Sequence, residues 1–175
     1  MTPINCLPEI PVVPQSPLPS EISPPWGPLI PRVATMAEPS SASSCFTTYR
    51  FPFGIPAFEH LTSFRLVTDP AWAPLAVLES ESEPPVRFAC APVALLMPDY
   101  RLELSSDEKA ALQWSEDQSE LLLYAILTFP QSGPPTANLL APVVLNPQTR
   151  LGVQSVQAHF PYSHLHPLRQ ESPCL

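Results

Sequence analysis

The stretch TANLLAPVVLN, from Thr136 to Asn146, has the apolar spacing of a β-strand. Every second residue is apolar, as in a strand packed on a core, and this face carries Ala137, Leu139, Ala141, Val143 and Leu145. The opposite face is apolar in the middle and has Asn138 and Asn146 near its ends, which indicates a partly covered surface. Pro142 has no backbone N–H, so the strand is either interrupted there or lies at a sheet edge.

The segments on either side of this stretch predict further strands. Leu121 to Phe129 is apolar on both faces apart from Tyr124 and Thr128, which predicts a central strand covered on both sides. The loop PQSGPP leads back into TANLLAPVVLN, and the turn NPQT leads on into a strand over Arg150 to Gln157. The three segments together predict an antiparallel meander.

Upstream, alternating apolar and polar residues predict strands over residues 45–51, 64–68, 74–79, 86–90 and 100–104. The residues expected to point inward are Phe64, Leu66, Thr68, Val86, Phe88, Cys90, Tyr100, Leu102 and Leu104. An acidic run, Glu79, Glu81 and Glu83, is expected in a loop. Ser105 and Glu108 match a capping box, which predicts one short helix with Ala110, Ala111 and Trp114 on one side. The sequence therefore predicts an all-β fold, a small antiparallel barrel-like domain with one short helix.

Proline divides the chain into unlike regions. There are 27 prolines against 4 glycines, and 10 of the prolines lie between Met1 and Pro31. This density disfavours helix and strand, so residues 1–44 are expected to be a Pro-rich, largely disordered arm and linker. The alternatives are that the arm docks in an aromatic-lined groove, or that translation starts at Met36. The barrel domain is expected over residues 45–168, followed by a flexible tail over 169–175.

Charge and cysteine content exclude several functional classes. With 8 Lys and Arg against 16 Asp and Glu, the chain has few cations to neutralise phosphates, so direct nucleic-acid binding is disfavoured and a basic protein partner fits better. The four cysteines form no CxxC pair, which indicates neither a zinc ribbon nor a secreted disulfide framework. No apolar run reaches the roughly 18 residues of a membrane helix, and no signal peptide is evident. We expect a cytoplasmic protein without a cofactor and without membrane binding.

Four motifs, in order along the chain, resemble those of the FliW family of bacterial flagellar assembly factors. TANLLAPVVLN is one of them. FPFGIPAFEHLTSFRL, from Phe51 to Leu66, is similar to the family pattern FPxGIPGFExLxxFxL. Pro98, Asp99 and Tyr100 resemble the PDY element of the family, and Tyr162 with the segment 166–168 resembles its closing Tyr and HPL. The chain departs from the family at Phe53, Ala57 and Leu165, where an acidic residue, Gly and Arg are usual.

The resemblance implies a noncatalytic, barrel-like protein with two protein partners. One is CsrA, a small dimeric repressor that binds messenger RNA, and the other is flagellin. Free flagellin occupies a FliW protein, and export of flagellin releases that protein to bind CsrA. The bound CsrA then no longer represses translation of flagellin, and the family implies that this antagonism is noncompetitive with RNA.

The residues expected to bind a partner are motif residues with prominent side chains: Phe58, Glu59, Pro98, Asp99, Tyr100, Asn138, Asn146, Tyr162 and His166. Phe58 is either an exposed anchor after a sharp turn or a seal at one end of the barrel. Each asparagine either closes a turn by bonding nearby backbone or contacts the partner, and the two roles are compatible. Tyr100 is expected to be a buried ring with a bonded hydroxyl group. Acidic residues over 79–83, 107–108 and 116–120 would form one negative face that steers the partner.

An enzymatic alternative is a metal- or thiol-dependent small hydrolase. Its candidates are His159, His164 and His166 with Cys90, because His164 and His166 project the same way in an extended chain. A Gly-rich phosphate loop and a nucleophile elbow are both missing from the sequence. His166 is also explained as an anchor for the C-terminal segment, so we expect no catalytic residue and no metal site.

Overall fold

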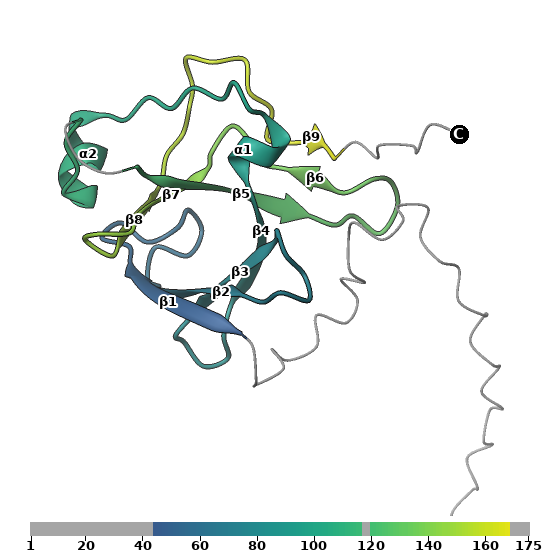
Figure 1. The fold of residues 1–175 in the computed structure, drawn as a ribbon, viewed down its shortest axis with the longest axis horizontal. Coiled ribbons are helices and arrows are strands. Elements are labelled where there is room, and N and C mark those ends of the chain that lie inside the picture. The colour runs from purple at the N-terminus through teal and green to yellow at the C-terminus, as the bar shows by residue number, and fades with distance from the viewer. Residues whose placement is uncertain (1–43, 117–119, 169–175) are drawn as a thin grey trace, which may run out of the picture.

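The computed structural model describes residues 44–116 and 120–168, which fold into a closed β-barrel with two short helices (Figure 1). The predicted Pro-rich arm, apart from Ser44, and the predicted C-terminal tail lie outside the described residues. No helix within residues 44–116 and 120–168 is long and apolar enough to span a membrane.

The described strands and helices are mostly short. In chain order they are β1 (Cys45–Arg50), β2 (Ser63–Thr68), β3 (Ala76–Ser80), β4 (Arg87–Pro92), α1 (Val93–Leu96), α2 (Ser106–Leu112), β5 (Leu122–Thr128), β6 (Thr136–Ala137), β7 (Val143–Asn146), β8 (Leu151–Gln154) and β9 (His166–Pro167).

Two meanders make up the barrel. The strand order is β4-β3-β2-β1-β8-β7-β5, and pairing of β5 with β4 closes the ring. All these neighbours are antiparallel except β1 and β8, which meet in parallel at the seam between the meanders through Arg50 and Leu151. β6 and β9 extend the sheet beyond β5. The predicted all-β barrel is therefore confirmed, with one parallel pair in an otherwise antiparallel sheet.

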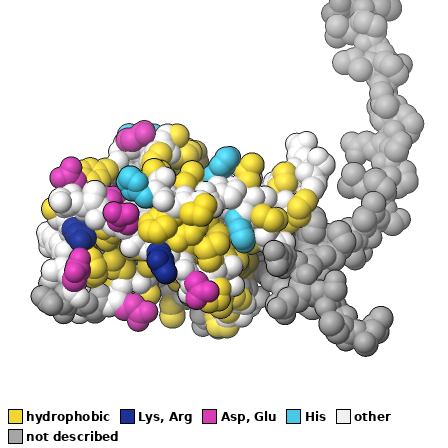
Figure 2. Space-filling view, turned by 90° about the horizontal axis from the view of Figure 1, so that it is seen from above, with side chains coloured by type: hydrophobic (Ala, Val, Ile, Leu, Met, Phe, Trp, Pro, Cys, Tyr) yellow, Lys and Arg dark blue, Asp and Glu magenta, His cyan; other side chains and the backbone are white. Residues whose placement is uncertain are grey.

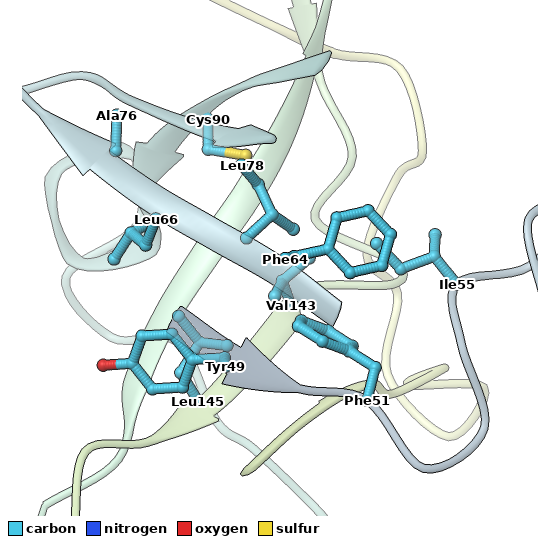
Figure 3. Packing of buried hydrophobic residues seen from close by; sticks show 10 residues of the cluster. All are labelled: Tyr49, Phe51, Ile55, Phe64, Leu66, Ala76, Leu78, Cys90, Val143 and Leu145. Carbon is cyan, nitrogen blue, oxygen red and sulfur yellow. The ribbon is translucent and has the colours of Figure 1, made fainter. Parts of the chain in front are cut away.

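The barrel interior is filled by a cluster of buried apolar side chains from both meanders (Figure 3). Phe51 and Phe64 pack edge to face there, with ring centroids 5.1 Å apart. Gly152 of β8 leaves room for this packing, because a Cβ atom at that position would lie 2.6 Å from the Phe51 ring. The inward side chains of β2 and β3, such as Leu66 and Leu78, are buried as their alternation predicts.

The stretch 136–146 is not one continuous strand. β6 ends at Ala137 and β7 begins at Val143, so of the two alternatives at Pro142 the structure shows the interruption. Between them the backbone bonds to the segment that follows β8: Ser155 N donates to Pro142 O at 3.0 Å, and Gln157 N donates to Leu140 O at 2.8 Å. The segment between β6 and β7 is therefore hydrogen-bonded to the start of the loop that carries residues 155–165.

Two predictions about side-chain exposure in β2 and β3 are wrong. Thr68 is exposed and Val67 is buried, because Trp72 from the following turn packs on Val67. Glu79 lies in β3 rather than in a loop, and it is 8 % exposed. Its carboxylate forms ion pairs with Arg65 of β2 and Arg87 of β4, which compensate the cost of burying its charge.

The prediction of the helical content and of one further strand also needs correction. α2 begins with the predicted capping box, but α1 is a second, unpredicted helix of one turn directly after β4. The buried residue of α2 is Leu112, whereas Ala110 is exposed. Residues 100–104 run extended without joining a strand of the described barrel, although their apolar residues do face inward.

Candidate functional site

Three of the four sequence motifs meet on one surface of the barrel. Tyr100 lies beyond α1, and its hydroxyl group donates a hydrogen bond to Leu139 O at 2.8 Å. Leu139 N in turn donates to Ser163 O at 3.0 Å, and His166 of β9 pairs with Ala137 of β6. The PDY, TANLL and closing Tyr-HPL segments are therefore in contact although they are far apart in the sequence.

Three stacked aromatic rings form the centre of this surface, and we call Tyr100, Phe160 and Tyr162 the aromatic patch. The Tyr100 and Tyr162 rings lie 4.3 Å apart with 18° between their planes, and Phe160 stacks on Tyr162 at 5.3 Å and 21°. All three side chains are partly buried, so part of each residue faces solvent. Rigid rings with few rotatable bonds provide contact area at a low entropic cost, which suits a protein-binding surface.

Hydrogen bonds hold the patch in place. Tyr162 Oη accepts a hydrogen bond from Arg101 N at 2.8 Å and donates to Arg101 O at 3.2 Å. Burial raises the pKa of Tyr100 well above its ordinary value, and the nearby Tyr162 adds to this shift. The Tyr100 hydroxyl group is therefore protonated near neutral pH and acts as a hydrogen-bond donor.

A buried glutamine positions the extended segment 100–105. Gln157 is 2 % exposed, and its side-chain amide accepts from Glu103 N at 2.8 Å and donates to Glu103 O at 3.0 Å. The amide also donates to the hydroxyl group of Ser155 at 2.8 Å. The Gln157 side chain thus bonds the backbone of residue 103 in the way a neighbouring strand would. The sequence carries no clear signal for this role, because Gln157 follows Gln154 and Ser155 in a segment of mixed polarity.

The two asparagines close turns, as the sequence suggested, but only one lies near the patch. Asn138 Oδ1 accepts a hydrogen bond from Ala141 N at 3.0 Å, within the interruption between β6 and β7. Asn146 is 1 % exposed, and it bonds Leu112 O at the end of α2 and Gln148 N in the following turn. A partner contact at Asn146 would therefore require the side chain to leave these bonds.

The turn that carries Phe58 and Glu59 is separate from the patch. Phe58 is partly buried and packs edge to face on Phe88 with ring centroids 5.4 Å apart, so it covers the core rather than standing free. Glu59 is exposed, and hydrogen bonds from its own backbone N–H and from Ala57 N lower the pKa of its carboxyl group. The exposed ring of this turn is Phe53, at 57 % exposure.

The candidates for hydrolysis are not assembled. Cys90 is fully buried in the barrel core, and desolvation raises the pKa of its thiol group to about 12, so the reactive thiolate is disfavoured. His159 and His164 are exposed, and His166 is partly buried. In the part of the chain that the structure describes, no three His, Cys, Asp or Glu side chains are grouped so that they could hold a metal ion.

The surface around the patch is apolar with acidic side chains at its margin. Figure 2 views the molecule from above the view of Figure 1, and hydrophobic side chains gather in the middle of that face with Asp, Glu, Lys, Arg and His side chains among and around them. Leu95 of α1 is 60 % exposed and Leu165 is 54 % exposed, while Pro98, Asp99 and Glu103 are also exposed. An apolar centre with charged groups around it has the composition of a protein-interaction surface.

The fold and this site define a class of small closed β-barrels in which the linear motifs converge on an aromatic surface. A crystal structure of the flagellar assembly factor FliW has the same fold, with a TM-score of 0.62 and 30 % sequence identity, over 71 % of this chain and 88 % of that one. The family model for the FliW protein matches residues 39–168.

Curated bacterial relatives agree with this family. The flagellar assembly factor FliW of Syntrophomonas wolfei is 37 % identical over 121 residues, which cover 69 % of this chain and 77 % of the relative. That of Moorella thermoacetica is 35 % identical over 126 residues, covering 70 % and 78 %. The chain therefore belongs to the FliW family of flagellar assembly factors.

Proposed function

We propose that this flagellar assembly factor acts without catalysis in the cytoplasm by binding two proteins in turn. One is flagellin, and the other is the translational repressor CsrA, whose repression of flagellin messenger RNA it would relieve. The observation that carries the proposal is the family match over residues 39–168, within which all four motifs of the resemblance lie. Exchange of one partner for the other would couple flagellin synthesis to its export.

The charge of the chain supports a basic partner. The net charge is -8, and several of the few cations are already paired within the protein. Arg65 and Arg87 bond Glu79, and Lys109 bonds Glu116 at 2.9 Å. The protein would therefore present mainly negative charge to a basic RNA-binding repressor. Such complementarity chiefly increases the association rate, so we expect binding to slow as salt is added.

Apolar contact at the aromatic patch would supply most of the affinity. Exposed ion pairs contribute only about 0 to 1 kcal/mol each, whereas aromatic anchors dominate many interfaces. If CsrA binds away from its RNA surface, as the resemblance implies, a coupling of roughly 1 to 3 kcal/mol would lower its RNA affinity by about 5 to 150 fold.

Titration calorimetry of the full chain with its cognate CsrA tests the proposal. We expect the parent protein to form a complex. Phe160→Ala removes one ring of the patch without removing a side-chain hydrogen bond, and it should weaken binding at least tenfold. A tenfold loss corresponds to about 1.4 kcal/mol, which is typical of one anchor residue. Phe53→Ala is the matched control, because Phe53 is an exposed ring outside the patch. Absence of any complex with CsrA at tens of micromolar would refute CsrA binding, and the same titration with flagellin tests the second partner.

A further inference from the structure

One backbone edge of β1 has no neighbouring strand over most of its length. On one side, all six residues of β1 pair with β2. On the other side, β1 pairs with β8 only at its last residue, where Arg50 lies opposite Leu151. β8 begins at Leu151, so the hairpin β7–β8 does not run beside residues 45–49. Within the part of the chain that the structure describes, these residues therefore have a strand on one side only.

The free backbone groups on this edge belong to Phe46 and Thr48. Arg50 N donates to Arg150 O, away from β2, whereas Phe51 N donates to Thr62 O on the β2 side. Backbone groups alternate between the two sides of a strand, so the N–H and C=O groups of Phe46 and Thr48 also point away from β2. Both residues are exposed, and no described residue bonds these groups. β1 therefore offers two donors and two acceptors to an added strand.

The sequence of β1 has none of the features that protect a sheet edge. Natural edge strands are very short or carry proline, charged side chains or a bulge, which prevents strand addition. β9, which ends the sheet beyond β6, is two residues long and contains Pro167. By contrast, β1 has six residues, and its residues 45–49 include neither proline nor a charged side chain. This contrast favours the addition of a partner strand at β1.

The outward side chains of β1 favour a strand with apolar and acidic residues. Phe46 is 64 % exposed, and the Arg65 guanidinium group lies over its ring, 5.7 Å from the centroid. Arg50 is on the same face of β1 as Phe46, because the two are an even number of residues apart. It is exposed, and among the described residues no carboxylate forms an ion pair with it. An added strand would therefore be complementary with an apolar side chain beside Phe46 and a carboxylate beside Arg50.

A second copy of this chain is a poorer match for the same edge. Residues 44–50 read SCFTTYR and contain no acidic residue. Two β1 strands paired through this edge would therefore leave both Arg50 side chains without a carboxylate from the partner strand. The charge of the edge favours a strand from a different protein.

We propose that the free edge of β1 binds an extended, acidic segment of a partner protein by strand addition. The backbone groups of Phe46 and Thr48 form the ladder hydrogen bonds, an apolar side chain of the segment packs on Phe46, and a carboxylate pairs with Arg50. Figure 1 shows β1 far from α1 and β9, which border the aromatic patch. The proposal is therefore independent of CsrA and flagellin binding at the patch.

The test follows the backbone amides of the full chain by ¹⁵N NMR while a short synthetic peptide is added. The peptide alternates valine and threonine, has blocked termini, and has an aspartate at each end so that either strand direction places one beside Arg50. We expect hydrogen exchange at the Phe46 and Thr48 amides to slow roughly tenfold or more at saturation, because each gains a hydrogen bond. The amides of β7, which is already paired on both sides, are the internal control.

Substitutions separate the charge from the apolar contact. Arg50→Gln should weaken binding of the aspartate peptide by about two- to fivefold, the scale of one exposed ion pair, and should not affect a peptide with asparagine in place of aspartate. Lys109→Gln is the matched control, because it changes the net charge equally on α2. Phe46→Ser should weaken binding of both peptides, whereas Phe53→Ser, at another exposed ring, should not.

Several outcomes would overturn the proposal. If the aspartate peptide does not protect the two amides, or if the asparagine peptide binds the parent protein equally well, the edge does not select an acidic strand. Protection that is already present in the free chain at every protein concentration would assign the edge to residues 1–43 of the same chain. Protection that grows with protein concentration would assign it to a second copy.

Discussion

Replacing Tyr162 by Phe removes one oxygen atom and keeps the stacked ring. That oxygen bonds both the N–H and the carbonyl group of Arg101. Each bond contributes about 0.5 to 1.5 kcal/mol net, and water compensates part of the loss because these bonds lie at the surface. We therefore expect Tyr162→Phe to lower the free energy of unfolding by about 1 to 2 kcal/mol.

The ring makes a separate contribution that Tyr162→Leu measures. This variant also loses the stacking contacts with Tyr100 and Phe160, which are worth about 0.5 to 1.5 kcal/mol each beyond their buried area. The total loss should be about 2 to 5 kcal/mol. The difference between the Phe and Leu variants therefore reports the loss of the stacked ring, including the apolar area that the ring buries.

Urea unfolding, monitored by circular dichroism, measures the free energy of unfolding of both variants. An unchanged m value shows that parent and variant expose the same surface area on unfolding. Tyr100→Phe is the control, because its hydroxyl group bonds Leu139 O rather than Arg101. Because the two rings are in contact at 4.3 Å, the losses of Tyr100→Phe and Tyr162→Phe should depart from additivity by about 0.5 kcal/mol or more in the double variant. A Tyr162→Phe variant as stable as the parent would refute the reasoning.

Three other variants test local features of the barrel. Ala57 has a φ angle of 71°, in the left-handed region where glycine is less strained than alanine. Ala57→Gly should therefore raise the free energy of unfolding by about 0.5 to 1 kcal/mol. A variant with a lower melting temperature would contradict this. Asn146→Ala removes hydrogen bonds to Leu112 O, Gln148 N and Thr149 N, and urea unfolding should show a loss of about 2 to 4 kcal/mol. Burial raises the pKa of the Cys90 thiol from 9.0 to about 12, so the unfolded chain loses this proton first as the pH rises. Stability should therefore be constant below pH 9 as far as Cys90 is concerned and fall from about pH 9 to 12, by up to roughly 1.4 kcal/mol per pH unit. Cys90→Ala should show a shallower fall, and an equal slope in both proteins would refute this assignment.

The strands and one helix were predictable because their signals are local. Alternation along β2 and β4 and the apolar run of β5 identify strands within a few residues. The capping box at Ser105 is also local: Ser105 Oγ accepts from Glu108 N at 3.3 Å, and Glu108 Oε2 accepts from Ser105 N at 2.8 Å. Such patterns report which face of an element is apolar, and that was enough to predict the barrel.

The buried polar groups were not predictable because their partners are distant in the sequence. Glu79 looks like part of an exposed acidic run until the register places it between Arg65 and Arg87. Gln157 bonds the backbone of Glu103, which is 54 residues away. The stacking of Tyr100 on Tyr162 depends on the same long-range closure. Tyr100 and Tyr162 of the candidate site were thus identified by motif, whereas Phe160 and Gln157 were not, and the contacts of all four required the fold.

The aromatic patch is held mainly by side chains rather than by a strand ladder. The extended segment that follows Tyr100 is attached through Tyr162 and Gln157, so these residues combine structural and surface roles. Phe160 makes no side-chain hydrogen bond, because its ring has no polar atom, and it stacks at the end of the series. Substituting Tyr162 therefore changes both stability and the surface, whereas substituting Phe160 changes the surface with a smaller effect on the hydrogen-bonded frame. A loss of binding in Phe160→Ala at unchanged m value and near-parental stability would thus assign the contact to the patch itself.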